Sequence, residues 1–448
     1  MEYGLISVVP AVILILFALK TRRTFEALII GTFVTYIIIK GPGFLTAWID
    51  SLFEVLTDQD VQWVIIVCGL FGSLIALLEA SNGTISFTEK MASICKSAKS
   101  SLVVTWIMGM LIFIDDYLNI ITLGTCMCPL TDRYKEPREA TSYIIDSTAA
   151  PVCVLLPIST WSIFYASMFF ARPEIAALGF SSATSMYVSI IPYSFYPIFT
   201  EIIVLLFCLK LMPKMGRMKK AYERMENAPE IQIKKKSDIP DGKKGTIWDF
   251  LIPIVILVIL TLVYGEILIG LIVSLAVCLV MFLPRRLMTF GEFCDSFMKG
   301  FCNMIPTLAV LVAAFLMQQA AQDIGLQQYI ISVAEPLMSP ALFPAITFIA
   351  VSLLTFVTGS NWGIPAACVP IVIPLASAVG ADMILTMAAI VSAGTFGSHA
   401  CFYSDATVMT SAACEMENMD HALSQIPYAM FGAVLSLAAF LICGIAGL

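Results

Sequence analysis

Acidic and amide side chains interrupt an apolar stretch early in the chain. "FIDDYLN" at 113–119 places Asp115, Asp116 and Asn119 among residues that suit lipid. A carboxylate at the centre of a bilayer costs roughly 2.5–3.5 kcal/mol on insertion scales, so an acid in such a position is usually functional. Asp116 and Asn119 are three residues apart and share one face of a helix. We expect both to bind a cation or a charged group of a solute; the alternative is that the acids cap a helix end.

Two longer polar breaks follow, "IIDSTAAPVCVLLPISTW" at 144–161 and "SAGTFGSHACFYSDATVMTS" at 392–411. Small residues, prolines and hydroxyls suit a discontinuous helix whose free carbonyls and half-helix ends face ligands. Asp405 has oxygen-rich neighbours, which suits Na⁺ or a carboxylate that releases a proton. For the hydroxyls, ordinary helix–helix hydrogen bonding is the alternative, and Asp146 could instead cap a helix start. The candidate cation- or solute-binding residues of the breaks are Asp146, Ser159, Thr160, His399, Ser404, Asp405 and Thr407.

Composition identifies a membrane protein. Of 448 residues, 59% are hydrophobic and 13% charged, whereas soluble domains carry about 25% charged residues. Runs long enough to span a bilayer recur, which predicts an all-α polytopic fold. The thirteen cysteines lack metal-site spacing, and neither HExxH nor GxSxG occurs. We therefore expect no enzyme activity, no cofactor and no nucleic-acid partner.

The chain resembles itself on either side of a hydrophilic segment, 213–247, which predicts two repeats, 1–212 and 248–448. Four matches occur at offsets of 242 to 245: Pro10 with Pro253, Asp50 with Asp295, Gly83 with Gly325, and Asn119 with Asn361. Placing successive loops on alternate sides puts every Lys and Arg in the cytoplasm except Lys40 and Arg172, which is 23 of 25. This distribution predicts inverted halves, a cytoplasmic linker at 213–247, and both termini outside the cell membrane.

Basic residues flank both ends of 100–131, which favours a re-entrant hairpin with its tip at 115–119. The counterpart, 341–377, has its tip at 358–363 and enters from outside. Non-helical backbone at membrane depth survives only where protein or water covers it. Two tips meeting near the midplane form a site, to which the second contributes Ser360 and Asn361. The expected architecture is ten spans in a 5+5 inverted repeat with two re-entrant hairpins.

Together, "FIDDYLN", "PLTD", "IIDSTAAPV", "TGSNWG" and "GSHACFYSDAT" resemble the NhaC-type sodium/proton antiporter family of the ion-transporter superfamily. The family pattern Gly-Asp-His is matched at Gly397 and His399, but Ser398 replaces the acid. The resemblance implies an elevator-type homodimer in the lipid bilayer. Its scaffold comprises about 1–98 and 248–340, and its transport domain about 99–212 and 341–448. Family members include sodium/proton exchangers and coupled carriers of organic acids and amino acids.

The leading hypothesis is Na⁺/H⁺ antiport by a secondary active transporter, with Na⁺ and H⁺ as coupling ions and Asp116, Asn119 and Asp405 as Na⁺ ligands. The alternative is Na⁺- or H⁺-coupled transport of a small charged organic solute, an amino acid or a carboxylate, contacted by Ser159, Thr160, Ser360 and Asn361. A channel or an intramembrane enzyme fits the sequence less well.

Overall fold

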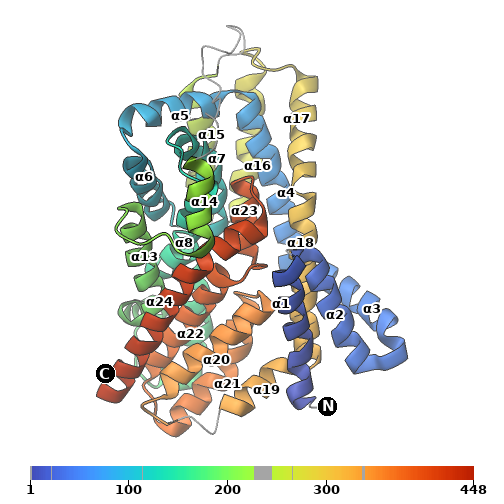
Figure 1. The fold of residues 1–448 in the computed structure, drawn as a ribbon, viewed down its shortest axis with the longest axis vertical. Coiled ribbons are helices and arrows are strands. Elements are labelled where there is room, and N and C mark those ends of the chain that lie inside the picture. Colours follow the sequence, from blue (N-terminus) through green and yellow to red (C-terminus); the bar gives the residue numbers. More distant parts are fainter. Residues whose placement is uncertain are drawn as a thin grey trace.

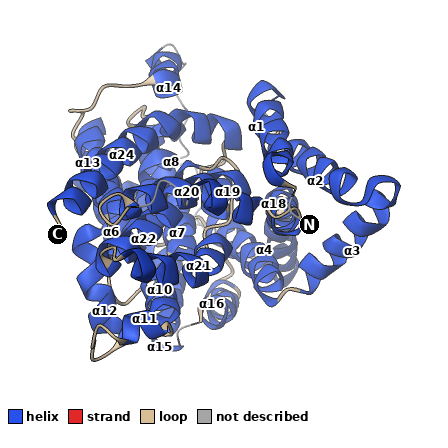
Figure 2. Ribbon diagram, turned by 90° about the horizontal axis from the view of Figure 1, so that it is seen from below, coloured by secondary structure: helices blue, strands red, loops and turns tan. Residues whose placement is uncertain are grey.

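The computed structural model describes residues 3–21, 23–113, 115–226, 245–264, 266–334 and 339–447. Within these ranges every regular element is a helix (Figure 2). The helices before the linker are α1 (Val9–Thr21), α2 (Thr24–Lys40), α3 (Phe44–Thr57), α4 (Gln59–Ala80), α5 (Gly83–Ile94), α6 (Ala98–Leu111), α7 (Asp116–Arg133), α8 (Arg138–Ser147), α9 (Ala150–Leu155), α10 (Thr160–Phe170), α11 (Pro173–Ala176), α12 (Ala183–Ile190), α13 (Phe195–Cys208) and α14 (Gly216–Glu226). Those after it are α15 (Ile247–Tyr264), α16 (Ile267–Phe282), α17 (Phe290–Asn303), α18 (Ile305–Asp323), α19 (Leu326–Ala334), α20 (Phe343–Thr358), α21 (Gly363–Val379), α22 (Met383–Ala400), α23 (Asp405–Ala413) and α24 (Asn418–Ala446).

Five helical stretches of the described residues are long and apolar enough to cross a membrane, or seven if two bent pairs each count as one span. This agrees with the polytopic membrane protein that the composition predicts. Helix α16 and three limbs of the predicted hairpins, α6, α20 and α21, have 14 to 17 residues. At 1.5 Å per residue these are about 21–26 Å long, which is shorter than the hydrocarbon core of about 30 Å.

Local sequence sets where the helices around the polar breaks begin and end. The side chains of Asp115, Ser159 and Ser404 each accept a hydrogen bond from a backbone amide in the first turn of α7, α10 and α23, satisfying donors that have no partner inside the helix. At the end of α20, Gly359 adopts a left-handed conformation with φ of 69°, which glycine accepts without strain.

Helices α6 and α7 form a hairpin, and so do α20 and α21. The Tyr134 hydroxyl donates to the Cys95 carbonyl, which brings the open ends of the first hairpin together. At the open end of the second, Ala341 and Gly380 line one surface hollow. The first hairpin lies in the upper part of Figure 1 and the second in the lower part, so they point toward each other. Helix α6 ends at Leu111 and α7 begins at Asp116, while α20 ends at Thr358 and α21 begins at Gly363, close to the predicted tips.

Helix α22 runs through the centre of the bundle, and all of its residues from Leu385 to Ala400 are buried. It packs closely against α20 at Gly397. A Cβ atom added to this glycine would lie only 2.3 Å from the Cβ of Thr355, so no larger residue fits there without a shift. Helices α4 and α17 pack as closely, since a Cβ on Gly72 would lie 2.4 Å from the carbonyl oxygen of Gly300. In contrast, α2 and α3 project from the body as an arm (Figures 1 and 2).

The described part of the predicted linker forms the basic helix α14; residues 227–244 lie outside the described ranges. Tyr222 donates a 2.5 Å hydrogen bond to Glu136, and Arg224 pairs with Glu139 at 2.7 Å, which fixes α14 to the α7–α8 turn. Burial and the nearby Glu136 charge raise the pKa of Tyr222, so the phenol stays a donor.

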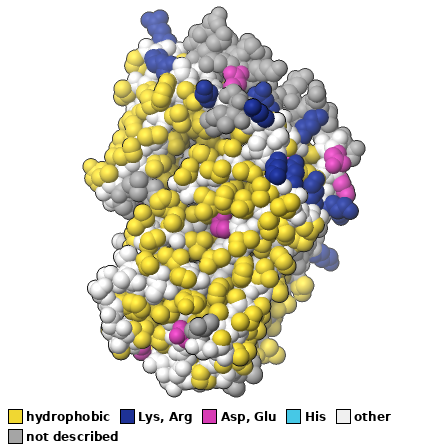
Figure 3. Space-filling view, turned by 90° about the vertical axis from the view of Figure 1, so that its left-hand side faces the viewer, with side chains coloured by type: hydrophobic (Ala, Val, Ile, Leu, Met, Phe, Trp, Pro, Cys, Tyr) yellow, Lys and Arg dark blue, Asp and Glu magenta, His cyan; other side chains and the backbone are white. Residues whose placement is uncertain are grey.

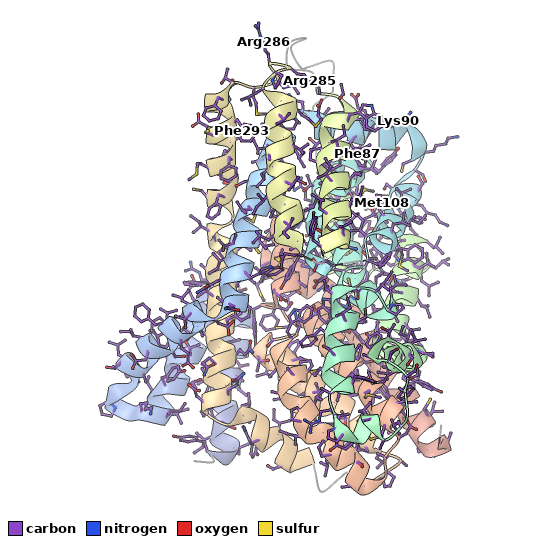
Figure 4. All side chains as sticks on the ribbon, turned by 180° about the vertical axis from the view of Figure 1, so that it is seen from behind. Phe87, Lys90, Met108, Arg285, Arg286 and Phe293 are labelled. Carbon is purple, nitrogen blue, oxygen red and sulfur yellow. The ribbon has the colours of Figure 1, made fainter. Side chains whose placement is uncertain are left out.

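Basic side chains gather at one end of the molecule. Lys90, Arg285 and Arg286 lie at the upper end in Figure 4. On the face shown in Figure 3, Lys and Arg likewise lie mainly in the upper part, and mostly hydrophobic surface extends below them.

Candidate cation-binding site

Two broken helices, one in each half, supply the centre of the site. Helix α10 starts after a break in the first half, and α23 starts after a break in the second. The Ser159 hydroxyl donates to the Cys153 carbonyl at 2.5 Å, and the Ser404 hydroxyl donates to the Ser398 carbonyl at 2.6 Å. Both donor and acceptor pairs are offset by 245 positions, the same offset as Asp50 and Asp295. The two breaks therefore share one local geometry, and in both the predicted serine is a helix cap.

Asp405 is the first residue of α23 and is 8% exposed. Its Oδ2 accepts a 2.5 Å hydrogen bond from the Tyr117 hydroxyl, and its Oδ1 accepts from the Ala406 amide at 2.8 Å. The side-chain amide of Asn361, at the second hairpin tip, also donates to Oδ1. The amide oxygen of Asn361 has no hydrogen-bond partner. Residues from both tips thus converge on one carboxylate, as the sequence predicted for Asn361.

Asp116 is fully buried, and neither of its carboxylate oxygens has a hydrogen-bond partner. Asn119 on the same face donates to the carbonyls of Gly109, Ile112 and Thr148 at 2.8 to 3.0 Å, while its own oxygen is unpartnered. A buried oxygen without a donor is unfavourable unless a proton or cation compensates it. Three unpartnered oxygens therefore lie directly behind the first tip.

Asp115, whose role the sequence left open, is the N-cap of α7. One oxygen accepts from the Leu118 amide at 3.0 Å and the other from the Thr160 hydroxyl at 3.2 Å. The capping alternative thus holds for Asp115, whereas Asp116 lies inside the helix. Asp115 and Thr160 also line the main cavity.

That cavity has a volume of about 580 Å³ and lies between two groups of helices. Helices α4, α16 and α18 form one wall; α10, the two hairpin tips and the start of α23 form the other. Four predicted residues line it: Thr160, Ser360, Asn361 and Asp405. Four carboxylates line it, from Asp58, Asp115, Glu266 and Asp405, and no Lys, Arg or His of the described residues does.

An apolar seam closes the cavity on one side. Along α4, Trp63 lines the cavity, Cys68 and Phe71 line the seam, and Glu79 lines a second hollow of about 290 Å³. The same order holds along α23, where Asp405 is followed by Met409 in the seam. The space within the seam is about 10 Å³, at the lower limit for a single water molecule. Asp405 is therefore accessible from one side only.

A second polar cluster lies behind the cavity, around Asp146. Its Oδ2 accepts from Gln425 at 2.7 Å, from His421 at 3.1 Å and from Thr407 at 3.2 Å. Asp146 lies inside α8, so the alternative that it caps a helix start is wrong.

His399 joins this cluster through other partners, since its Nε2 lies 3.0 Å from the Ser147 hydroxyl and its Nδ1 lies 2.8 Å from the Tyr196 hydroxyl. The Ser147 hydroxyl donates its single proton to the Tyr143 carbonyl oxygen at 2.6 Å. The Ser147 hydroxyl therefore accepts from His399, which places a proton on the Nε2 atom of His399. His399 and Asp405 therefore belong to different clusters, although the chain does unwind between them at 401–404.

Sequence reasoning missed Tyr117, Glu266, His421 and Gln425. The position of Glu266 near a helix end predicts interface snorkelling or capping. Glu266 does cap α16 through the Leu268 amide at 3.0 Å, but it also lines the cavity, where its Oε1 accepts from Trp63 at 2.9 Å. His421 and Gln425 are four residues apart, so their shared helix face was the available signal. Among the described residues, no group of three or more His, Cys, Asp or Glu is arranged to hold a metal ion.

Comparison with known proteins agrees with the resemblance in the motifs. An uncharacterized protein of Haemophilus influenzae is 25% identical over 98% of this chain and 90% of its own length. A solved structure, described as "Structure and Function of Neisseria gonorrhoeae MtrF Illuminates a Class of Antimetabolite Efflux Pumps", aligns with 89% of this chain and 83% of that chain. Its sequence identity is 11% and the TM-score is 0.34. The sequence model of the Na⁺/H⁺ antiporter family matches residues 168–445, which is 278 of 448 residues. The chain belongs to the Na⁺/H⁺ antiporter family.

Proposed function

We propose that this chain is a secondary transporter that exchanges Na⁺ for H⁺ at Asp405. The observation that carries the proposal is the position of this carboxylate, which lines a cavity on one side and is sealed by an apolar seam on the other. A carboxylate that binds either a proton or Na⁺, but not both, couples the two ions when the side of access alternates. The free amide oxygen of Asn361 supplies a neutral ligand beside it.

Asp116 is the second carboxylate of this proposal. It lies close enough to Asp405 for their charges to interact, and its oxygens are unpartnered. We assign Asp116 and Asn119 to the cation pathway behind the first tip. The Asp146 and His399 cluster lies outside the cavity, and we assign its members to positioning α8, α22 and α24 around the site.

Alternating access follows from motion of one wall past the other. We propose that the wall formed by α4, α16 and α18 belongs to the scaffold, about 1–98 and 248–340. The opposing wall then belongs to the transport domain, about 99–212 and 341–448. An elevator movement would separate the two faces of the apolar seam and expose Asp405 to the second hollow. The matched breaks at a 245-residue offset support the 5+5 inverted repeat, and the opposed hairpins support their re-entrant character.

We place the linker end in the cytoplasm and both termini outside the cell membrane. Lys90 and Arg285 lie at one end, and α14 pairs with the start of α24 through Arg217 and Asp420 at 3.3 Å. Both termini lie toward the opposite end in Figure 1. The projecting α2–α3 arm exposes Leu45, Ile49 and Phe53, and we propose that it contributes to a homodimer.

Reconstitution into proteoliposomes tests the exchange. An inward Na⁺ gradient should drive protons out, which an internal pH-sensitive dye reports, and Asp405→Asn should abolish the signal. Asp50→Asn, an exposed acid on the arm, is the matched control and should behave as wild type. Absence of Na⁺-driven proton movement in the wild type, or its persistence in Asp405→Asn, would refute the proposal.

A further inference from the structure

The main cavity is much larger than a Na⁺ site requires. Its volume of about 580 Å³ compares with about 30 Å³ for one water molecule, and it falls within the roughly 300–1,000 Å³ of small-molecule pockets. A Na⁺ site accounts for a carboxylate at position 405. It does not account for a cavity of this size or for the other acidic and aromatic side chains that line it.

The charge of the cavity opposes the binding of an anionic cargo. Four carboxylates line it, and no basic residue of the described chain does. Helix N-termini can bind carboxylates through free amides, but at three helix starts beside the cavity one first-turn amide already bonds to a side chain. The Leu118 amide bonds to Asp115, the Gly363 amide to Ser360, and the Ala406 amide to Asp405. These three amides are therefore not free to bind the carboxylate of an organic acid or an amino acid, and the four carboxylates of the lining repel it.

Aromatic side chains also line the cavity. Trp362 and Phe164 meet edge to face with centroids 4.8 Å apart on the hairpin side. Trp63 and Tyr117 lie with centroids 5.9 Å apart nearer to Glu266 and Asp405. Aromatic faces attract organic cations, and they also pack against an apolar body.

Two side chains that line the cavity each have a buried oxygen without a hydrogen-bond partner. Asn361 and Thr261 line the cavity, are 1% and 3% exposed, and each has an oxygen without a hydrogen-bond partner. A primary ammonium offers three donors and no acceptor, which complements such a set.

We propose that the cavity binds, as a cation exchanged by the transporter, a small organic ammonium compound with an aromatic or apolar body. Its ammonium lies between Asp405, Asn361 and Glu266, and its body lies against Trp63 and Trp362. This proposal rests on the antiport function proposed above, because the ammonium takes the place of Na⁺ at Asp405. It narrows the organic-solute alternative from amino acids and carboxylates to cations.

The test uses the purified full-length protein in detergent and three probes with one phenyl body. These are 2-phenylethylamine, phenylalanine and 3-phenylpropionate, which are cationic, zwitterionic and anionic at pH 7. The amine should raise the thermal midpoint in a saturable manner, since a ligand of the folded state stabilises it, and Na⁺ should compete with it. Glu266→Gln should raise the Kd of the amine about tenfold, the loss of about 1.4 kcal/mol. Asp295→Asn, an exposed acid on α17, should leave the Kd unchanged.

Equal stabilisation by the amine and the propionate, or an unchanged Kd in both Glu266→Gln and Asp405→Asn, would overturn the proposal. The proteoliposome assay separates its failure from failure of the antiport. Na⁺-driven proton movement without amine binding refutes the ammonium site alone. Amine binding without Na⁺-driven proton movement refutes the antiport and leaves the ligand class of the cavity standing.

Discussion

Tyr117 and Asp405 lie 288 positions apart and are joined by a 2.5 Å hydrogen bond from the phenol to the carboxylate. Tyr117 belongs to the first turn of α7, at the tip of one hairpin, and Asp405 opens α23, after the break in α22–α23. The bond therefore ties the first half of the chain to the central acid of the second. It also orients the carboxylate toward the cavity that both residues line.

Tyr117→Phe should weaken cation binding without unfolding the protein. The substitution keeps the ring and removes one hydrogen bond to a charged group, worth about 1.5–3 kcal/mol. We expect the Na⁺ concentration for half-maximal proton movement to rise about tenfold or more. Tyr193→Phe, at a tyrosine outside the cavity, serves as the control. A Na⁺ dependence identical to wild type would remove Tyr117 from the site.

Asp116→Asn should abolish Na⁺-dependent transport while maintaining or raising the thermal midpoint. The carboxylate is fully buried, and neither oxygen has a hydrogen-bond partner, so replacing it with an amide of the same shape removes an uncompensated buried charge. The thermal midpoint in detergent and the proteoliposome assay give the two readouts. A lower midpoint with normal transport would mean that Asp116 is only structural.

The pair of Asp146 and His421 should contribute strongly to stability. Both side chains are buried and lie 3.1 Å apart, and removing one partner of a buried hydrogen bond leaves the other unsatisfied, at a cost of about 1–3 kcal/mol. Asp146→Ala and His421→Ala should each lower the thermal midpoint. The double variant should lose less than the sum of the two, because the partners are coupled. Additive losses would show that the pair does not interact.

A disulfide across the apolar seam should arrest transport. The sulfur atoms of Cys68 on α4 and Met409 on α23 lie 3.8 Å apart. Met409→Cys therefore places one thiol on each of two helices that would slide past each other in an elevator movement. Oxidation should stop Na⁺-driven proton movement, and reduction should restore it. Met409→Cys combined with Cys68→Ala should be insensitive to oxidation. Full activity of a cross-linked protein would argue against movement at this seam.

The sequence predicted the features that depend on local composition. Apolar runs in a membrane must form helices, because lipid supplies no partners for backbone groups. Polar insertions must then break or cap them. The tips near 115–119 and 358–363, the break between His399 and Asp405, and the positions of Asn361 and Asp405 at these breaks follow from that rule. So does the family, because its motifs lie at those breaks.

Tertiary structure alone decided which polar groups meet. Asp405 pairs with Tyr117 rather than with His399, and Asp146 pairs with His421 from the start of α24. Glu266, which caps the start of α16, lines the main cavity. These partners lie about 200 to 290 positions apart or come from different walls, and sequence periodicity describes only which face of one helix a residue occupies. How two such faces pack, and which charges that packing brings together, is set by the whole bundle.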